Sequence, residues 1–365
     1  MRVGVPKEIK NHEYRVGLTP PSVAELAAAG HNLIVQAGAG AGIDFSDADY
    51  VAAGARIVST AAEVFAGADM IVKVKEPQPV EIAMLEPRHL LFTYLHLAPD
   101  PEQATALMAS GATCIAYETV TARDGSLPLL KPMSEVAGRM SIQVGAHYLE
   151  KEQGGRGVLL GGVPGVAPAR VAILGGGVSG VNAAQMAVGM RADVTIYDIS
   201  NARLAELDMF FGSQIKTAYA SRAAIAAAVA GAHLVIGAVL VPGAAAPKLV
   251  TREMLKTMKR GSVLVDIAID QGGCFETSHA TTHDDPVFEV DGVIHYCVAN
   301  MPGAVARTSA FALNNATLPF ALRLANLGAD AAMAADPHLA AGLNVSGGKI
   351  RHKAVAEALG LPFDG

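Results

Sequence analysis

Residues 170–180 of this 365-residue chain read RVAILGGGVSG, and this stretch is the strongest indication of the fold in the sequence. The apolar run 171–174 predicts a buried strand, and the uncharged segment that follows Gly180 predicts a helix. Between them, Gly175, Gly177 and Gly180 have the spacing G-x-G-x-x-G. In a strand, turn and helix context this spacing is the fingerprint of a dinucleotide-binding domain, whereas the structural alternative is a glycine-rich loop needed only for a tight turn.

Each glycine of this fingerprint has a physical role in binding a dinucleotide. Gly175 permits the tight turn, Gly177 lets backbone amides approach the pyrophosphate, and Gly180 lets the helix pack closely on the strand. The helix N-terminus then faces the negative phosphates. Asp198 ends the next predicted strand, where a carboxylate accepts hydrogen bonds from both adenosine ribose hydroxyls and repels a 2′-phosphate. The sequence therefore predicts NAD rather than NADP, with an ordinary loop acid as the alternative for Asp198.

Further strand candidates surround the fingerprint and predict a doubly wound parallel sheet of the Rossmann type. They are residues 193–197, 234–240, 262–267 and 293–298. Ligands of such sheets bind outside the carboxyl ends of the strands. One of these ends carries two acids, Asp266 and Asp270, and the sequence alone does not assign a role to one over the other.

The N-terminal part of the chain also alternates short apolar runs with helical segments, which predicts a compact α/β domain. The expected strands are residues 2–5, 32–37, 70–74, 90–95 and 113–117, with a first helix at 20–29. Helix starts are marked by Thr19 before Pro20, and by the capping-box pairs Ser46 with Asp49 and Thr60 with Glu63.

Two other segments set the domain organisation. Residues 129–153 carry apolar residues at helical spacing and predict a long connecting helix. From about residue 307 onward the sequence predicts two or three helices and no obvious strand. Because such a tail often returns to pack on the first domain, we expect a discontinuous substrate domain of residues 1–128 plus 307–365. A Rossmann domain of residues 129–306 would then be inserted in it.

Charge and composition exclude several classes of protein. The chain has 34 acidic residues against 28 Lys and Arg, so its net charge of −6 offers no basic stripe for a nucleic acid. Two uncharged windows, 171–190 and 223–247, are long enough to span a bilayer. Glycines interrupt the first window, and His233, Pro242 and Pro247 interrupt the second, so both predict buried strands and turns rather than membrane helices.

Cysteine usage and the N-terminal residues bear on the compartment. Cys114, Cys274 and Cys297 match no metal spacing and no even-numbered disulfide framework. The first ten residues contain no apolar stretch of the length found in secretory signals. We therefore expect a cytoplasmic protein with reduced thiols.

Seven blocks in one order along the chain resemble the alanine dehydrogenases and, more distantly, the nucleotide-binding part of the transhydrogenase alpha subunit. The blocks are RVGVPKEIK (2–10) with EYRVGLTP (13–20), VKVKEP (72–77), FTYLHLA (92–98), PMSEVAG (132–138), LGGGVSG (174–180), VDIAIDQGG (265–273) and YCVANMPG (296–303). The resemblance runs essentially from end to end. It implies reversible oxidative deamination of L-alanine with NAD, giving pyruvate and ammonia, in a homohexamer with a cleft between the two domains.

Four residues have the chemistry that this reaction needs. Arg15 offers a guanidinium fork for the substrate carboxylate, and Lys75 can donate to the carboxylate or carbonyl oxygen. His96 ends a predicted strand and is suited to exchanging protons at neutral pH as water attacks and ammonia leaves. Asp270 is expected to act with His96. Without the resemblance, the competing interpretations are a surface arginine, a surface lysine and a structural histidine.

The resemblance also implies which residues surround the cofactor besides the three glycines. They are Ser134, Val178, Ser179, Asp198, Arg203, Val239, Leu240, Ile267, Ala268, Ile269, Asp270, Val298, Ala299, Asn300 and Met301. Some relatives bind magnesium through a glutamate that matches Glu118 and a histidine that matches position 327. Position 327 is Leu327 in this chain, so we expect no such metal site.

Two alternative functions stay open at this point. One is another amino-acid or 2-oxo-acid dehydrogenase of the same architecture, such as a saccharopine dehydrogenase, which also uses a lysine and a histidine. The other is a nonenzymatic NAD-binding module of the transhydrogenase kind. Such a subunit usually carries membrane helices after the NAD domain, whereas this chain ends in polar sequence and retains Arg15, Lys75, His96 and Asp270. These features favour an enzyme.

Overall fold

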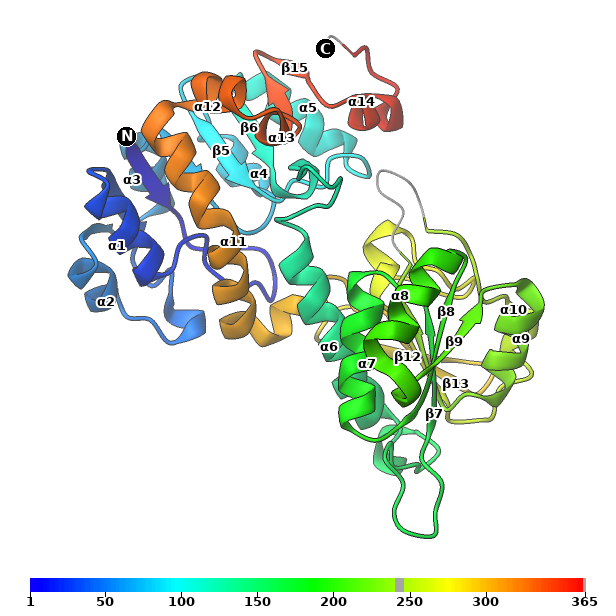
Figure 1. Ribbon diagram of the computed structural model, residues 1–365. Helices are drawn as coiled ribbons and strands as arrows, with labels where there is room; N and C mark the ends of the chain where they lie inside the picture. Colours follow the sequence, from blue (N-terminus) through cyan, green and yellow to red (C-terminus); the bar gives the residue numbers. More distant parts are fainter. Residues whose placement is uncertain (240–245, 364–365) are drawn as a thin grey trace. The chain divides into compact units, whose positions relative to one another are not determined.

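The computed structural model describes residues 1–239 and 246–363 and divides the chain into two compact units. Unit 1 comprises Met1–Met133 and Gly303–Gly365, and unit 2 comprises Ser134–Pro302 (Figure 1). Each unit is built on its own sheet, and parallel pairs predominate in both. The expected α/β class with doubly wound parallel sheets is confirmed.

The sheet of unit 1 has the strand order β15-β14-β6-β5-β4-β1-β2-β3. Its strands are β1 (Arg2–Val5), β2 (Asn32–Gln36), β3 (Ala55–Val58), β4 (Met70–Val72), β5 (Leu90–Thr93), β6 (Thr113–Ala116), β14 (Leu343–Ser346) and β15 (Lys349–Ile350). The six N-terminal strands are parallel. Every residue of β4 and β5 is buried, as in central strands covered on both faces. The strand order reverses between β1 and β4.

The C-terminal region contributes two strands, so the expectation of a tail without strands is wrong. β14 runs antiparallel to β6, and β15 folds back on β14. β14 was missed because its four residues contain no apolar run: Asn344 interrupts it, buried and bonded to the Thr119 hydroxyl at 2.7 Å. Its strand conformation comes from pairing with β6, far away in the sequence.

Helices cover the sheet of unit 1, and two of their starts have the predicted capping boxes. The helices are α1 (Pro20–Ala28), α2 (Asp47–Ala52), α3 (Ala61–Gly67), α4 (Pro79–Ile82), α5 (Pro101–Ser110), α11 (Ala306–Leu327), α12 (Ala329–Ala335), α13 (Pro337–Ala340) and α14 (Lys353–Leu359). Ser46 and Thr60 each cap a helix reciprocally. Thr19 occupies the predicted N-cap of α1, but its side chain makes no capping hydrogen bond, since its hydroxyl faces Ser22 at 3.3 Å.

The sheet of unit 2 has the order β12-β13-β11-β10-β7-β8-β9. Its strands are β7 (Arg170–Leu174), β8 (Asp193–Asp198), β9 (Lys216–Tyr219), β10 (Leu234–Gly237), β11 (Val263–Asp266), β12 (Val287–Val290) and β13 (Val293–Tyr296). The order reverses between β7 and β10, which is the arrangement of dinucleotide-binding sheets. Two edge strands were not predicted: β9, which is only partly buried, and β12, which is antiparallel to β13.

The long predicted helix and the fingerprint helix both lie in or reach unit 2. They are α6 (Lys131–Tyr148) and α7 (Val178–Gly189), followed by α8 (Asn201–Phe211), α9 (Arg222–Gly231) and α10 (Arg252–Leu255). Gly138 of α6 lets the two helices approach closely, because a Cβ there would lie 2.2 Å from the Ser179 carbonyl oxygen. The window 171–190 divides into β7, the glycine turn and α7. Within the described ranges, no helix has the length and apolarity needed to cross a membrane.

Candidate active site

Three candidate residues of unit 1 follow three neighbouring strands, β1, β4 and β5, and the strand order reverses between the first two. Arg15 lies in the segment after β1, Lys75 follows β4, and His96 follows β5. Ligands of open α/β sheets bind at the carboxyl ends of the strands beside such a reversal. The order of this sheet, which the sequence alone did not reveal, therefore places all three residues at the end of the sheet where a ligand is expected.

Hydrogen bonds hold the segments that carry Lys75 and His96 side by side. The parallel ladder of β4 and β5 continues past the strands, with Tyr94 N–H donating to the Val74 carbonyl at 3.2 Å. The Thr93 hydroxyl then donates to the Lys75 carbonyl at 2.9 Å. Lys75 is 8% exposed. Its backbone is thus fixed by the same segment that leads to His96.

Arg15 is buried, and an internal carboxylate orients it. Its Nε donates to Glu13 Oε1 at 2.7 Å and its Nη2 to Glu13 Oε2 at 2.5 Å, in a bidentate pair. Nη1 contacts the Met133 sulfur at 3.1 Å. Burial by itself would lower the pKa of Arg15, but the hydrogen bonds and charge of Glu13 raise it above its ordinary value. A guanidinium held in this way keeps its charge and a fixed direction.

A fully buried triad of ion-paired side chains is centred on Lys73, two residues before Lys75. Lys73 Nζ contacts Glu8 Oε2 at 2.9 Å and Glu81 Oε1 at 2.8 Å, and the three side chains are 0% to 1% exposed. Glu8 also accepts from Val74 N–H at 2.7 Å, and Glu81 accepts from Gln78 N–H at 2.8 Å. The triad ties the segment after β1 and helix α4 to the end of β4. Our sequence interpretation overlooked it, although a lysine between Val72 and Val74 in an apolar strand is the signal of a buried charge pair.

His96 has a backbone conformation that residues other than glycine seldom adopt. Its φ is 50°, in the left-handed region, where a non-glycine residue costs about 1–3 kcal/mol. The imidazole stacks on the ring of Tyr94 with centroids 5.7 Å apart and planes 10° from parallel. The Tyr94 hydroxyl is itself fixed on the Leu129 carbonyl at 2.6 Å. Among the described residues, none hydrogen-bonds the ring nitrogens of His96, which are therefore available to a substrate.

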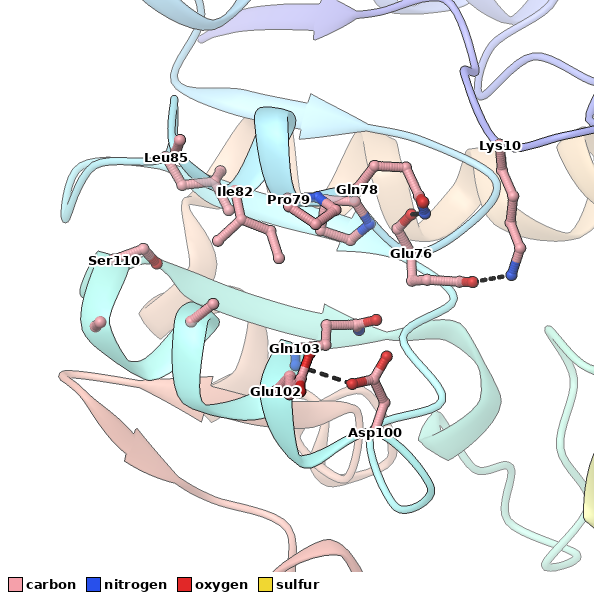
Figure 2. A pocket seen from close by; sticks show the side chains of 14 residues that line it. Lys10, Glu76, Gln78, Pro79, Ile82, Leu85, Asp100, Glu102, Gln103 and Ser110 are labelled. Atoms are coloured by element: carbon pink, nitrogen blue, oxygen red, sulfur yellow. Dashed lines mark hydrogen bonds and ion pairs between the residues drawn. The ribbon is translucent and has the colours of Figure 1, made fainter.

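A separate groove of about 770 Å³ lies on unit 1 between α4 and α5 (Figure 2). Ile82 and Leu85 supply apolar lining, and Asp100 accepts from Gln103 N–H at 3.0 Å. Figure 2 also shows the ion pair of Lys10 and Glu76 at one end of the groove. Its lining does not include Arg15, Lys75 or His96, so the groove is not part of the arrangement around these side chains.

The glycine loop of unit 2 fits a bound pyrophosphate. Gly175 has φ 105°, and a Cβ on Gly180 would lie 1.9 Å from the Gly175 carbonyl oxygen, so this turn excludes other residues. By contrast, a Cβ on Gly177 would have no atom of the described residues within 4 Å, so these residues leave space in front of the loop. Gly177 is also the N-cap of α7 and provides no side-chain cap. The first amides of the helix can therefore donate to phosphate oxygens.

Asp198 lies at the end of β8 beside this loop. Its carboxylate accepts from Gly176 N–H and from Ser200 N–H, both at 2.8 Å. A carboxylate has about four lone-pair positions, so two remain for ribose hydroxyls. Arg203 borders the same loop, with Nε donating to the Gly176 carbonyl at 2.7 Å and an ion pair to Glu206 at 2.6 Å. The residues that the sequence singled out for adenosine binding are thus brought together around Gly176.

The carboxyl end of β10 borders the turn of the fingerprint. Ala238 N–H donates to the Leu174 carbonyl at 2.8 Å, and Val239 lies against Gly175. Leu240, the next predicted cofactor contact, lies outside the described residues. This is where the strand order reverses, so Val239 occupies the position expected of a residue that contacts a dinucleotide.

The structure distinguishes the two acids after β11. Asp266 is 0% exposed and accepts from Ser278 Oγ at 2.6 Å and from Cys274 N–H at 2.9 Å. Burial raises the pKa of Asp266 above its ordinary value despite these hydrogen bonds. Asp270, in the single turn η5 (Ile267–Gln271), is exposed. Asp266 therefore folds the turn, and Asp270 is left accessible for chemistry.

The other predicted cofactor residues have mixed exposure. In η5, Ala268 and Ile269 are buried and Ile267 is half-buried. After β13, Val298 and Met301 are buried, while Ala299 and Asn300 are half-buried. In the fingerprint helix Val178 is 38% exposed and Ser179 half-buried, and Ser134 of α6 is half-buried.

Side chains that could hold a metal ion and free thiols are the remaining features of the site's chemistry. In the part of the chain that the structure describes, no three His, Cys, Asp or Glu side chains are grouped so as to hold a metal ion. Cys114, Cys274 and Cys297 are buried free thiols. Glu118 accepts backbone hydrogen bonds from Leu95 N–H and His96 N–H.

Comparison with known proteins places these features in a family. The family models "Alanine dehydrogenase/PNT, N-terminal domain" and "Alanine dehydrogenase/PNT, C-terminal domain" match residues 4–137 and 141–353. The chain is similar to an alanine dehydrogenase of Halomonas elongata, with 61% identity over 100% of this chain and 98% of the relative. It is 56% identical to an alanine dehydrogenase of Bacillus subtilis, over 100% of this chain and 96% of the relative.

Solved structures agree with the sequence relatives. A structure of an L-alanine dehydrogenase superposes with a TM-score of 0.95 at 54% identity and covers 99% of both chains. A transhydrogenase from Sinorhizobium meliloti superposes with a TM-score of 0.84 at 29% identity, covering 96% of this chain and 100% of the other.

Proposed function

The chain belongs to the alanine dehydrogenase family, and from that premise we propose that it catalyses the reversible, NAD-dependent oxidative deamination of L-alanine. The balanced reaction converts L-alanine, NAD⁺ and water into pyruvate, ammonium, NADH and a proton. The observation that carries the proposal is the placement of Lys75 and His96 on adjoining segments after β4 and β5, next to the reversal of strand order in unit 1, in a chain that also has a complete dinucleotide loop.

Two cations hold the substrate in this proposal. Arg15 binds the α-carboxylate, since its guanidinium is buried, charged and oriented by Glu13. Lys75 donates to the carboxylate or to the oxygen that becomes the ketone of pyruvate. A positive charge beside that oxygen stabilises the negative charge that develops on it during the reaction. The rigid backbone of Lys75 contributes by fixing the origin of its side chain.

The residues proposed for the cofactor would hold NAD⁺, which would supply the acceptor for the α-carbon hydride. The substrate ammonium first loses one proton to solvent, so that departure of the hydride leaves the substrate as an iminium, the protonated imine. His96 then removes a proton from water as the water oxygen bonds to the imine carbon. The protonated imidazole returns that proton to the nitrogen, and the carbon–nitrogen bond breaks as the neutral imidazole takes the hydroxyl proton and the ketone forms. His96 then passes this proton to the departing ammonia, which leaves as ammonium. We assign Asp270 to act with His96 by stabilising the imidazolium.

Most of the cofactor residues that we propose lie at or just after the ends of β7, β8, β10, β11 and β13, whereas Ser134 lies in α6 and Arg203 in α8. Asp198 is supported as the ribose ligand by its place beside Gly176, and a carboxylate there favours NAD over NADP. We further propose a cytoplasmic homohexamer, which light scattering on the purified chain tests directly. A mass other than six chains would contradict the hexamer without affecting the activity.

The experiment that tests the function is an NADH-oxidation assay with ammonium and a panel of 2-oxo acids. Pyruvate is expected to be the best substrate, ahead of bulky and dicarboxylic acids, and L-alanine with NAD⁺ is expected to run the reverse direction. Preference for a larger 2-oxo acid would indicate a different dehydrogenase of the same architecture. NADH binding without turnover of any acid would indicate a nonenzymatic NAD-binding module.

A further inference from the structure

We infer that Glu118 is a positioning residue for His96: its carboxylate holds the backbone that aims the imidazole. The inference rests on the proposed function, in which His96 exchanges protons with the substrate. Glu118 lies in η2 (Tyr117–Thr119), directly after β6, and β6 is the parallel neighbour of β5. The carboxylate is therefore delivered to the segment of His96 by the adjacent strand.

Two successive amides converge on this one carboxylate. His96 N–H donates to Glu118 Oε1 at 2.6 Å. Leu95 N–H lies 3.2 Å from Oε1 and 3.3 Å from Oε2. Consecutive N–H groups point to a common side when one residue adopts the left-handed conformation, and such a concavity binds an anion. The φ of 50° at His96 is that conformation.

The carboxylate accounts for a strained backbone at a residue with a proposed catalytic role. Without an anion, the two amides lose their acceptor and His96 gains by returning to an extended conformation. Its Cβ would then leave the chain in a different direction, and the imidazole would leave its stack on Tyr94. Gln103 supports the same turn from the other side, since its Nε2 donates to the Leu95 carbonyl at 2.8 Å.

The substitution Glu118→Ala tests the inference. Because a displacement of about 1 Å at a reacting group reduces rates by on the order of 10², we expect kcat/KM for L-alanine to fall on that order while NADH binding is unchanged. Glu118→Gln keeps an oxygen that accepts both amides and is expected to retain activity within about tenfold of the wild type. Glu118→Asp keeps the charge but is one methylene shorter, so it is expected to behave like the alanine variant and replaces it if that variant does not fold.

Glu63→Ala is the matched control. Glu63 is also a unit 1 glutamate whose carboxylate accepts a backbone N–H, that of Thr60 at 2.9 Å, but it belongs to the capping box of α3. This variant is expected to lose stability and to keep wild-type kcat. Equal losses of kcat in the Glu63 and Glu118 variants would mean that general destabilisation explains both and would overturn the inference.

A double-mutant cycle separates positioning from a general structural role. If Glu118 acts through His96, then Glu118→Ala has no further effect on kcat/KM in a His96→Ala background. A full loss of on the order of 10² in that background as well would overturn the inference. A crystal structure of the alanine or aspartate variant gives a test without turnover: His96 is expected at a negative φ, and a φ still near 50° with the imidazole unmoved would also overturn it.

These readouts distinguish the two proposals from each other. A wild-type chain that turns over no 2-oxo acid refutes the proposed function, and the position of His96 in the variant structure still decides the role of Glu118. A wild-type chain that is active, with variants that are equally active, refutes only the role of Glu118.

Discussion

Replacing Lys73 by Met removes the cation from between two buried carboxylates. The ammonium contacts Glu8 at 2.9 Å and Glu81 at 2.8 Å, and all three side chains are 0% to 1% exposed. Removing one partner of a buried ion pair typically destabilises a protein by about 3–5 kcal/mol, because the remaining charge stays buried without compensation. We expect a loss of that size in the free energy of unfolding at pH 7.

The pH dependence follows from how the variant relieves the buried charge. Burial already raises the pKa of Glu8 even with Lys73 present, so without the lysine one proton is expected to be shared between the two carboxyls. A glutamate in the unfolded chain has a pKa of about 4.3, so keeping this proton bound in the folded variant costs about 1.36 kcal/mol for each pH unit above that value. The cost is about 4 kcal/mol at pH 7 and about 1 kcal/mol at pH 5. A folded-state pKa above the unfolded one means that stability is retained at low pH and lost as pH rises.

The assay is urea unfolding of the variant and the wild type at pH 5 and pH 7, followed by circular dichroism. The destabilisation is expected to shrink by about 2–3 kcal/mol at the lower pH. Lys353→Met is the matched control, because Lys353 forms an exposed pair with Glu357 on α14 in the same unit and should contribute less than about 0.5 kcal/mol. A Lys73→Met variant destabilised by less than about 1 kcal/mol, or equally at both pH values, would refute the reasoning.

Four further substitutions test the proposed site. His96→Ala and Asp270→Asn are each expected to lower the turnover of L-alanine while NADH binding stays intact. For His96→Ala the expected loss of turnover is about 10²–10⁴-fold, as for removal of a general acid or base. Near-normal turnover in both variants would exclude the assigned roles. Asp198→Ala removes two charge-assisted hydrogen bonds to ribose, so the Kd for NADH, measured by fluorescence titration, is expected to rise at least tenfold. The ratio of the Kd for NADPH to the Kd for NADH is expected to become smaller, because the carboxylate no longer repels a 2′-phosphate. A change in the Kd for NADH below about threefold would contradict the assignment. Gly180→Ala would place a Cβ 1.9 Å from the Gly175 carbonyl oxygen and is expected to abolish NADH binding. Gly189→Ala is the control in the same helix: among the described residues no neighbouring atom lies within 4 Å of a Cβ there, so NADH binding should be unchanged. Equal NADH affinities in these two variants would mean that the turn tolerates a side chain.

Local sequence was sufficient wherever a feature depends on neighbours along the chain. The strand, glycine turn and helix at 170–189 were predicted correctly because the features that determine them are local. The apolar pattern and the glycines Gly175 and Gly180, which have no Cβ, all lie within a short stretch of sequence. The capping boxes at Ser46 and Thr60 formed as expected, since each involves groups three residues apart. A polar strand such as β14 has no comparable local signal, and it takes its conformation from β6.

The chain's own residues therefore determine the class of sheet, the dinucleotide loop and the residue types available for chemistry. Which of these residues lie near one another was decided by tertiary structure, because it depends on strand order. The reversal between β1 and β4 collects Arg15, Lys75 and His96 at one end of the sheet. Burial distinguishes Asp266, whose carboxylate is buried, from Asp270, which is exposed. The position of β6 beside β5 brings Glu118 to the amides of His96, a contact across 22 residues that no spacing in the sequence encodes.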